Sequence, residues 1–203
     1  MYGYLIHHGV KGQKWGVRRF QNADGSLTPA GKKRYSRYSR DSVFISGSSK
    51  TQDKQSGYYR KQLPKDIRNE IDGYIKKGDK ILVGDAPGVD RQVQNYLKKK
   101  GYSNVVVYGP GSIRYSANKK WKTKAIDSSE YEPNSPEWLR KKDIAMTNDS
   151  TKGLAVVLEN GGAKATRNNV DRLVQQGKDV KVYELSIKGD KYIQDIIKKL
   201  DSQ

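Results

Sequence analysis

Three short stretches rich in glycine and serine carry the residues best suited to bind an anion. They are residues 46–49, 84–91 and 159–166, and each follows a run of apolar residues. Glycine lets the backbone approach a ligand without a Cβ, and the free N–H groups at the start of a helix favour negative charge. Each stretch by itself is equally well explained as an ordinary turn, so the inference depends on all three converging. The candidate binding residues are Gly47, Ser48, Ser49, Gly84, Asp85, Gly88, Asp90, Gly161, Gly162, Lys164 and Thr166.

Three carboxylates in or near these stretches are candidates for catalysis. Asp90 can bind a ribose hydroxyl or transfer a proton, and it can equally stabilise the first turn of a helix. Glu159 ends an apolar run just before the third stretch, where it would act as a nucleophile or general acid, or simply be solvated. Asp143 lies on the inward side of an expected helix, where it would enter the same cleft or pair with a neighbouring cation.

These stretches need a scaffold that brings them together. From residue 43 onward, short β-branched runs alternate with longer amphipathic runs, a pattern typical of βαβ units and a parallel sheet. We predict an α/β fold, a Rossmann-like parallel sheet of about five strands with helices on both faces, and the three stretches at the carboxyl ends of strands. The predicted strands are 43–46, 80–83, 105–108, 154–158 and 180–183, and the predicted helices are 64–77, 89–100, 136–148, 166–176 and 191–200.

The order of these motifs over residues 41–187 resembles that of the SLOG superfamily. Its members include the LOG phosphoribohydrolases, the DNA-processing A protein and nucleotide-sensing domains of bacterial immune effectors. The most specific part of the resemblance is the block Gly84-Asp85-Ala86-Pro87-Gly88-Val89-Asp90. The resemblance implies a bound nucleotide or nucleotide-derived signal. It assigns ligand contacts to Gly47 and Ser48 and to Gly84, Asp85, Gly88 and Asp90, and phosphate contacts to Gly161, Gly162 and Thr166.

One departure from that family concerns catalysis. The LOG enzymes carry a Pro-Gly-Gly-x-Gly-Thr-x-x-Glu signature whose glutamate serves hydrolysis of an N-glycosidic bond. The matching stretch, residues 159–169, has asparagine where that glutamate falls. The resemblance therefore implies nucleotide binding, to sense, sequester or process the ligand, and argues against LOG-type phosphoribohydrolysis. Two alternatives stay open: an N-glycosidase or deoxyribosyltransferase-type enzyme acting on nucleotides or NAD derivatives, and a basic nucleic-acid-binding virion protein.

Residues 1–40 are expected to form a basic N-terminal arm, followed by a nucleotide-binding domain at 41–187 and a C-terminal helix within 188–203. The arm holds nine Lys or Arg and one Asp, and the whole chain has a net charge of +18. Such charge favours non-specific binding to nucleic acid that weakens as salt rises. Residues 7–22 and 27–35 resemble a leader of phage structural and virion-associated proteins. This implies contacts with phage capsid or other virion proteins, and a location in the virion or the host cytoplasm.

Residues 109–135 are polar and irregular, so we expect a long loop there. Its cations would close over phosphates as a lid or form a solvated surface. Trp121 and Trp138 would stack on a base or pack in the core. The cations are Arg114, Lys119, Lys120, Lys122 and Lys124.

The composition excludes several other kinds of site. The chain has no cysteine, which excludes disulfides and thiolate zinc sites. His7 and His8 are adjacent and lack the spacing of a metal cluster, so we expect neither metal nor cofactor. No apolar run approaches the roughly 20 residues of a membrane span, so no membrane partner is expected. By analogy with related folds, a homo-oligomer is expected.

Overall fold

The computed structural model describes residues 40–159 and 163–186, together with residues 20, 22, 26 and 28–31 of the N-terminal part. The chain divides between Arg40 and Asp41, and the two parts are described separately. In the first part, the Thr28 N–H donates to the Phe20 carbonyl oxygen at 3.1 Å, so these two positions are drawn together. Most of the predicted arm, including both histidines, and the predicted helix 191–200 lie outside the described residues.

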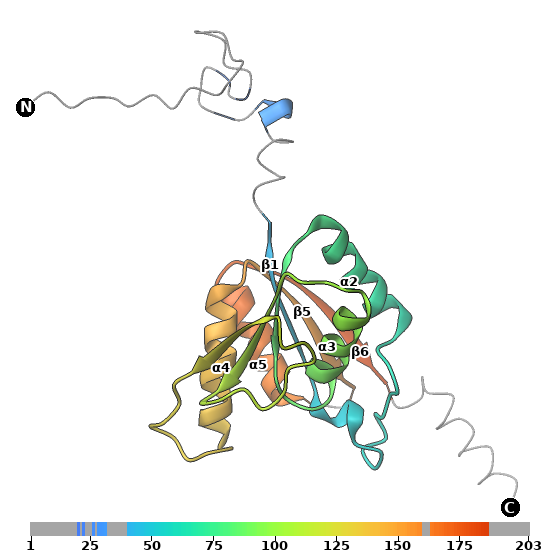
Figure 1. Cartoon of the computed structure of the whole chain (residues 1–203), viewed down its shortest axis with the longest axis vertical. Helices are drawn as coiled ribbons and strands as arrows, with labels where there is room; N and C mark the ends of the chain where they lie inside the picture. Colours follow the sequence, from blue (N-terminus) through green and yellow to red (C-terminus); the bar gives the residue numbers. More distant parts are fainter. Residues whose placement is uncertain are drawn as a thin grey trace, which may run out of the picture. The chain divides into compact units, whose positions relative to one another are not determined.

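The second part is an α/β domain built on one six-stranded sheet (Figure 1). All the strand pairs are parallel, and the strand order is β4-β3-β2-β1-β5-β6. This confirms the predicted Rossmann-like fold class. The elements are β1 (Ser42–Gly47), the 3-10 helix η1 (Ser49–Gln52), α2 (Lys65–Lys77), β2 (Lys80–Gly84), α3 (Val89–Lys99), β3 (Val105–Pro110), β4 (Lys122–Ile126), α4 (Pro136–Asp149), β5 (Lys152–Leu158), α5 (Lys164–Gln175) and β6 (Asp179–Leu185).

The core consists of two apolar layers, one on each face of the sheet. Successive strand residues point to opposite faces, so Val43 and Ile45 pack in one layer and Phe44 in the other. Helices α2 and α3 cover the first face, and Met146 of α4 and Leu173 of α5 cover the second. Burial on both faces explains why the central strands are near-continuous apolar runs.

Helix boundaries follow local signals that the sequence carries. Helix α2 ends at Gly78, which adopts φ 75° and whose N–H donates to the carbonyl oxygens of Tyr74 and Ile75. A left-handed residue at this position favours glycine, so the end of α2 falls where the sequence predicts it. Helix α4 begins after Ser135, whose side chain accepts a hydrogen bond from the Trp138 N–H at 3.1 Å.

The prediction of a loop over residues 109–135 is wrong in one respect: the stretch contains the strand β4. This strand pairs with β3 at the edge of the sheet, and its side chains are mostly exposed. An exposed edge strand has no buried face, so the sequence of β4, Lys-Thr-Lys-Ala-Ile, shows no apolar alternation. Lysines are common on such edges because they discourage pairing with another chain.

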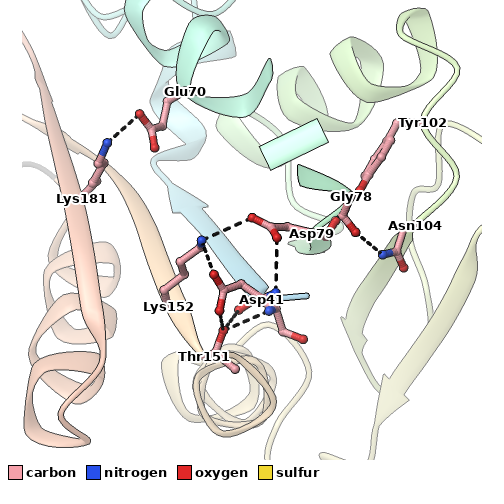
Figure 2. Close-up of polar contacts among 10 residues, drawn as sticks. Asp41, Glu70, Gly78, Asp79, Tyr102, Asn104, Thr151, Lys152 and Lys181 are labelled. Atoms are coloured by element: carbon pink, nitrogen blue, oxygen red, sulfur yellow. Dashed lines mark hydrogen bonds and ion pairs between the residues drawn. The ribbon is translucent and has the colours of Figure 1, made fainter. Parts of the chain in front are cut away.

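A polar network ties the amino ends of β1, β2 and β5 together (Figure 2). The Lys152 ammonium group donates to Asp41 Oδ2 at 2.5 Å and to Asp79 Oδ2 at 3.3 Å. The Thr151 hydroxyl donates to Asp41 Oδ1 at 3.0 Å and accepts from the Ser42 N–H at 3.0 Å. These charged and hydroxyl groups are therefore paired with one another at the amino ends of the three strands.

Within the described ranges, no helix combines the length and the apolar composition that crossing a membrane requires.

Candidate functional site

A cavity of about 310 Å³ lies at the carboxyl ends of the strands, where β1 and β5 lie side by side. From β1 the sheet continues through β2 on one side, and from β5 it continues through β6 on the other. This is the switch point at which open α/β sheets form a crevice. The lining residues are Phe44, Ser46, Gly47, Ser48, Ser49, Lys50, Ala86, Asp90, Arg114, Leu139, Lys142, Asp143, Ala163, Lys164, Ala165, Thr166 and Asn169.

The loop after β1 and the start of α3 interlock beside this cavity. A Cβ on Gly47 would lie 2.6 Å from Val89, and a Cβ on Gly88 would lie 2.3 Å from the Ser48 carbonyl oxygen. That oxygen accepts a hydrogen bond from the Val89 N–H at 3.1 Å, and the Gly88 N–H donates to Gln52 Oε1 at 3.0 Å. The two glycines are therefore explained by close packing within the protein. Two N–H groups at the start of α3 therefore already donate hydrogen bonds to oxygen atoms of the protein.

A buried charge cluster forms the floor of the cavity next to Gly84. A Cβ on Gly84 would lie 2.2 Å from Asp90 Oδ2 and 2.7 Å from the Lys142 ammonium nitrogen, so glycine leaves room for both side chains. Lys142 pairs with Asp143, their nitrogen and oxygen atoms lying 2.8 Å apart, and Asp143 also accepts a hydrogen bond from Asn169 at 3.2 Å. The cluster joins α3, α4 and α5.

Burial and the neighbouring charges shift the pKa values of Asp90 and Lys142 in opposite directions. Burial raises the pKa of Asp90 to about 6, although Lys142 opposes the rise and the Ala86 N–H donates to Asp90 Oδ2 at 3.3 Å. Burial also disfavours the charge of Lys142, but Asp143 and Asp90 outweigh it and raise the pKa of Lys142. Lys142 therefore stays protonated, and Asp90 is a buried carboxyl that changes charge in a mildly acidic range.

Asp85 holds the loop between β3 and β4 in place. Its buried carboxylate accepts hydrogen bonds from the Arg114 backbone N–H at 2.9 Å and from the Arg114 guanidinium group at 3.0 Å and 2.5 Å. The guanidinium group also lies 5.6 Å from the centre of the Trp138 ring. Arg114 reaches the cavity lining, whereas Asp85 does not. Asp85 therefore positions a cation, and Arg114 is anchored to the rest of the domain.

Two lysines of the lining are exposed and free to meet an anion. Among the described residues, neither Lys50 nor Lys164 forms an ion pair with a carboxylate, whereas Arg114 and Lys142 each do. Lys164 also begins α5, whose N-cap residue, Ala163, provides no side-chain hydrogen bond. A helix leaves its first N–H groups without partners within the helix, and they attract negative charge. The start of α5 is therefore better suited to an anion than the start of α3.

The structure brings most of the predicted site residues to this cavity, but not all of them. The predicted residues that line it are Gly47, Ser48, Ser49, Asp90, Asp143, Lys164 and Thr166, and those that do not are Gly84, Asp85, Gly88 and Glu159. Glu159 is half-buried after β5, where its N–H donates to the Leu185 carbonyl oxygen and its own carbonyl oxygen accepts from the Tyr58 hydroxyl. Gly161 and Gly162 lie outside the described residues.

Sequence reasoning missed Lys50, Lys142 and Asn169. Lys142 lies at helical spacing with Leu139 and Met146 on the inner side of α4. This spacing indicates a buried position, but a lysine is normally expected on the surface. Of the two tryptophans weighed for stacking, Trp121 is a core residue whose indole N–H donates to the Tyr102 carbonyl oxygen at 2.9 Å.

Within the described residues, no three His, Asp or Glu side chains gather closely enough to hold a metal ion. A scan against protein-family models finds no match, and a search of curated proteins finds no related sequence. The cavity and its charged residues are therefore what indicates the class of ligand.

Proposed function

We propose that the domain binds a nucleotide or nucleotide-derived ligand in the cavity between β1 and β5. The observation that carries the proposal is the start of α5, which its N-cap residue Ala163 does not cap, next to Lys50 and Lys164 on the same cavity, neither of which pairs with a carboxylate of the described residues. Helix N–H groups and ammonium groups together suit a phosphate group. The resemblance to the SLOG superfamily supports the same class of ligand.

The rest of the cavity suits the uncharged part of a nucleotide. Its volume of about 310 Å³ lies within the range of small-molecule sites. Phe44 and Leu139 supply apolar surface for a sugar or base, and Asp90 and Asp143 are placed to accept hydrogen bonds from sugar hydroxyls. Arg114, fixed by Asp85, adds a flat cationic group on which a base can stack.

Isothermal titration with AMP, GMP, CMP, UMP and NAD tests the proposal. At least one of these is expected to bind, and its nucleoside without phosphate is expected to bind much more weakly. Lys50→Gln and Lys164→Gln should each weaken binding about tenfold, the size of one charge-assisted hydrogen bond. Lys76→Gln removes the same charge from an exposed position on α2 and serves as the matched control. Absence of binding across the panel, or equal effects in all three variants, would contradict the proposal.

The buried carboxyl of Asp90 favours a second candidate function, hydrolysis of the N-glycosidic bond of the bound nucleotide. A carboxyl with a pKa of about 6 beside the cavity can exchange a proton with a reacting group near neutral pH. Because Glu159 does not line the cavity, this candidate depends on Asp90 and Asp143. Release of free base by the wild type, lost in Asp90→Asn while nucleotide binding persists, would support it. No release from any nucleotide of the panel would exclude it for these substrates.

A further inference from the structure

A second cavity of about 390 Å³ adjoins the first, in the groove between α4 and α5. The two cavities share four lining residues, so one ligand can extend from the first into the second. The shared residues are Leu139, Asp143, Lys164 and Ala165, and the groove adds Pro136, Glu137, Arg140, Asn168 and Arg172.

Two arginines face this groove from opposite helices without a carboxylate bound to either. Among the described residues, no ion pair is formed by Arg140 or by Arg172. The Arg172 Nε is buried and has no hydrogen-bond partner, although another nitrogen of the same guanidinium group donates to Asn169 Oδ1. Burial lowers the pKa of Arg172, Asp143 opposes this, and Arg140 contributes to the lowering. A partly buried guanidinium group without a carboxylate partner is unfavourable, and an anion bound in the groove would compensate its charge.

The acidic residues of the groove leave it cationic. Of its two carboxylates, Asp143 is already paired with Lys142, and Glu137 is exposed at the first turn of α4. The groove has three cationic side chains: Arg140, Arg172 and, where the two cavities meet, Lys164.

We propose that this groove binds a second anionic group of the ligand, so that the ligand is a 5′-phosphorylated dinucleotide or a similar molecule with two separated phosphates. This rests on the function proposed above. Arg172 lies eight residues beyond Lys164 in α5, and its guanidinium group donates to Asn169, which lies five residues, about 7.5 Å along the helix axis, beyond Lys164. Adjacent phosphates of a diphosphate share one oxygen and do not cover that separation. Two phosphates with a nucleoside between them suit it better.

Titration calorimetry with eight ligands tests the inference: the four 5′-mononucleotides and the dinucleotides pApA, pGpG, pCpC and pUpU. The wild type should bind its preferred dinucleotide about tenfold or more tightly than the matching mononucleotide, since the second phosphate gains charge-assisted hydrogen bonds. Arg140→Gln and Arg172→Gln together should abolish that preference and leave mononucleotide affinity unchanged. Arg140→Gln alone, at an exposed position, should reduce the preference without a folding defect. Lys76→Gln is the charge control.

The outcomes separate the two proposals. Binding of mononucleotides with no dinucleotide preference, or a preference that survives in the double variant, overturns the second phosphate site and leaves the proposed function standing. Equal loss of both ligand classes in Arg140→Gln also overturns it. Absence of binding by all eight ligands and by NAD overturns both proposals together.

Discussion

Replacing Asp90 by asparagine should stabilise the domain at neutral and basic pH. The Asp90 side chain is buried between α3 and the charge cluster, and burial raises its pKa from 3.8 to about 6 against the pull of Lys142. Asparagine has nearly the same shape as the protonated acid and can accept the same hydrogen bond from the Ala86 N–H. It carries no charge to desolvate at any pH.

The sign and the size of the effect follow from the pKa. The folded state holds the Asp90 proton more tightly than the unfolded state, so this group favours folding below about pH 4 and the benefit is lost as the pH rises through about 6. At 1.36 kcal/mol per pKa unit, the loss amounts to about 3 kcal/mol. Asp90→Asn should therefore match the wild type near pH 4 and exceed its free energy of unfolding by about 3 kcal/mol at pH 8.

Urea unfolding at several pH values, followed by tryptophan fluorescence, measures this difference. Glu132→Gln removes an exposed negative charge and controls for the change in net charge. Comparing variants at each pH cancels the other acids that titrate below pH 5. An Asp90→Asn protein that is no more stable than the wild type at pH 8, or a gain that is the same at pH 4 and pH 8, would refute the reasoning.

Four further changes test the packing and the charge pairs of the domain. Gly84→Ala should cost about 1–3 kcal/mol of unfolding free energy in a urea titration, because its Cβ would overlap the buried charge cluster. Gly73→Ala, whose Cβ meets nothing within 4 Å in α2, should instead gain about 0.5–1 kcal/mol. Asp85→Asn should cost about 2 kcal/mol and speed proteolysis of the loop that contains Arg114, since it breaks their ion pair. Lys152→Met should shift acid unfolding to higher pH, because Lys152 lowers the pKa of Asp41 and the stability gained from that carboxylate is lost as the pH falls below about 4.

The fold could be predicted where a buried strand appears in the sequence as an apolar run. The runs at 43–46 and 154–158 fall inside β1 and β5, because strands buried on both faces are composed mostly of apolar residues. The edge strand β4 is not an apolar run, because most of its side chains are exposed. Its position is set by pairing with β3, which no local pattern reports.

The site could be located but not resolved from sequence. The sequence predicts a ligand contact for Gly88, but the structure explains this glycine by its contact with the loop after β1. Ligand binding and close packing both require glycine at this position, so the sequence does not distinguish them. Asp85 was also assigned to a ligand, but its partner is Arg114, a pairing that only the folded chain reveals. Lys142 is buried with two carboxylates that balance its charge, Asp143 on the same helix and Asp90 on α3. The sequence alone does not show this pairing, so it does not predict a buried lysine in the site.

The most direct test of phosphate binding at α5 is an NMR titration that follows the backbone amides of Lys164, Ala165 and Thr166. Adding the tightest-binding 5′-mononucleotide should shift all three resonances strongly, and adding the corresponding nucleoside should shift them little. If these amides do not respond while a nucleotide binds elsewhere on the chain, the central claim is contradicted.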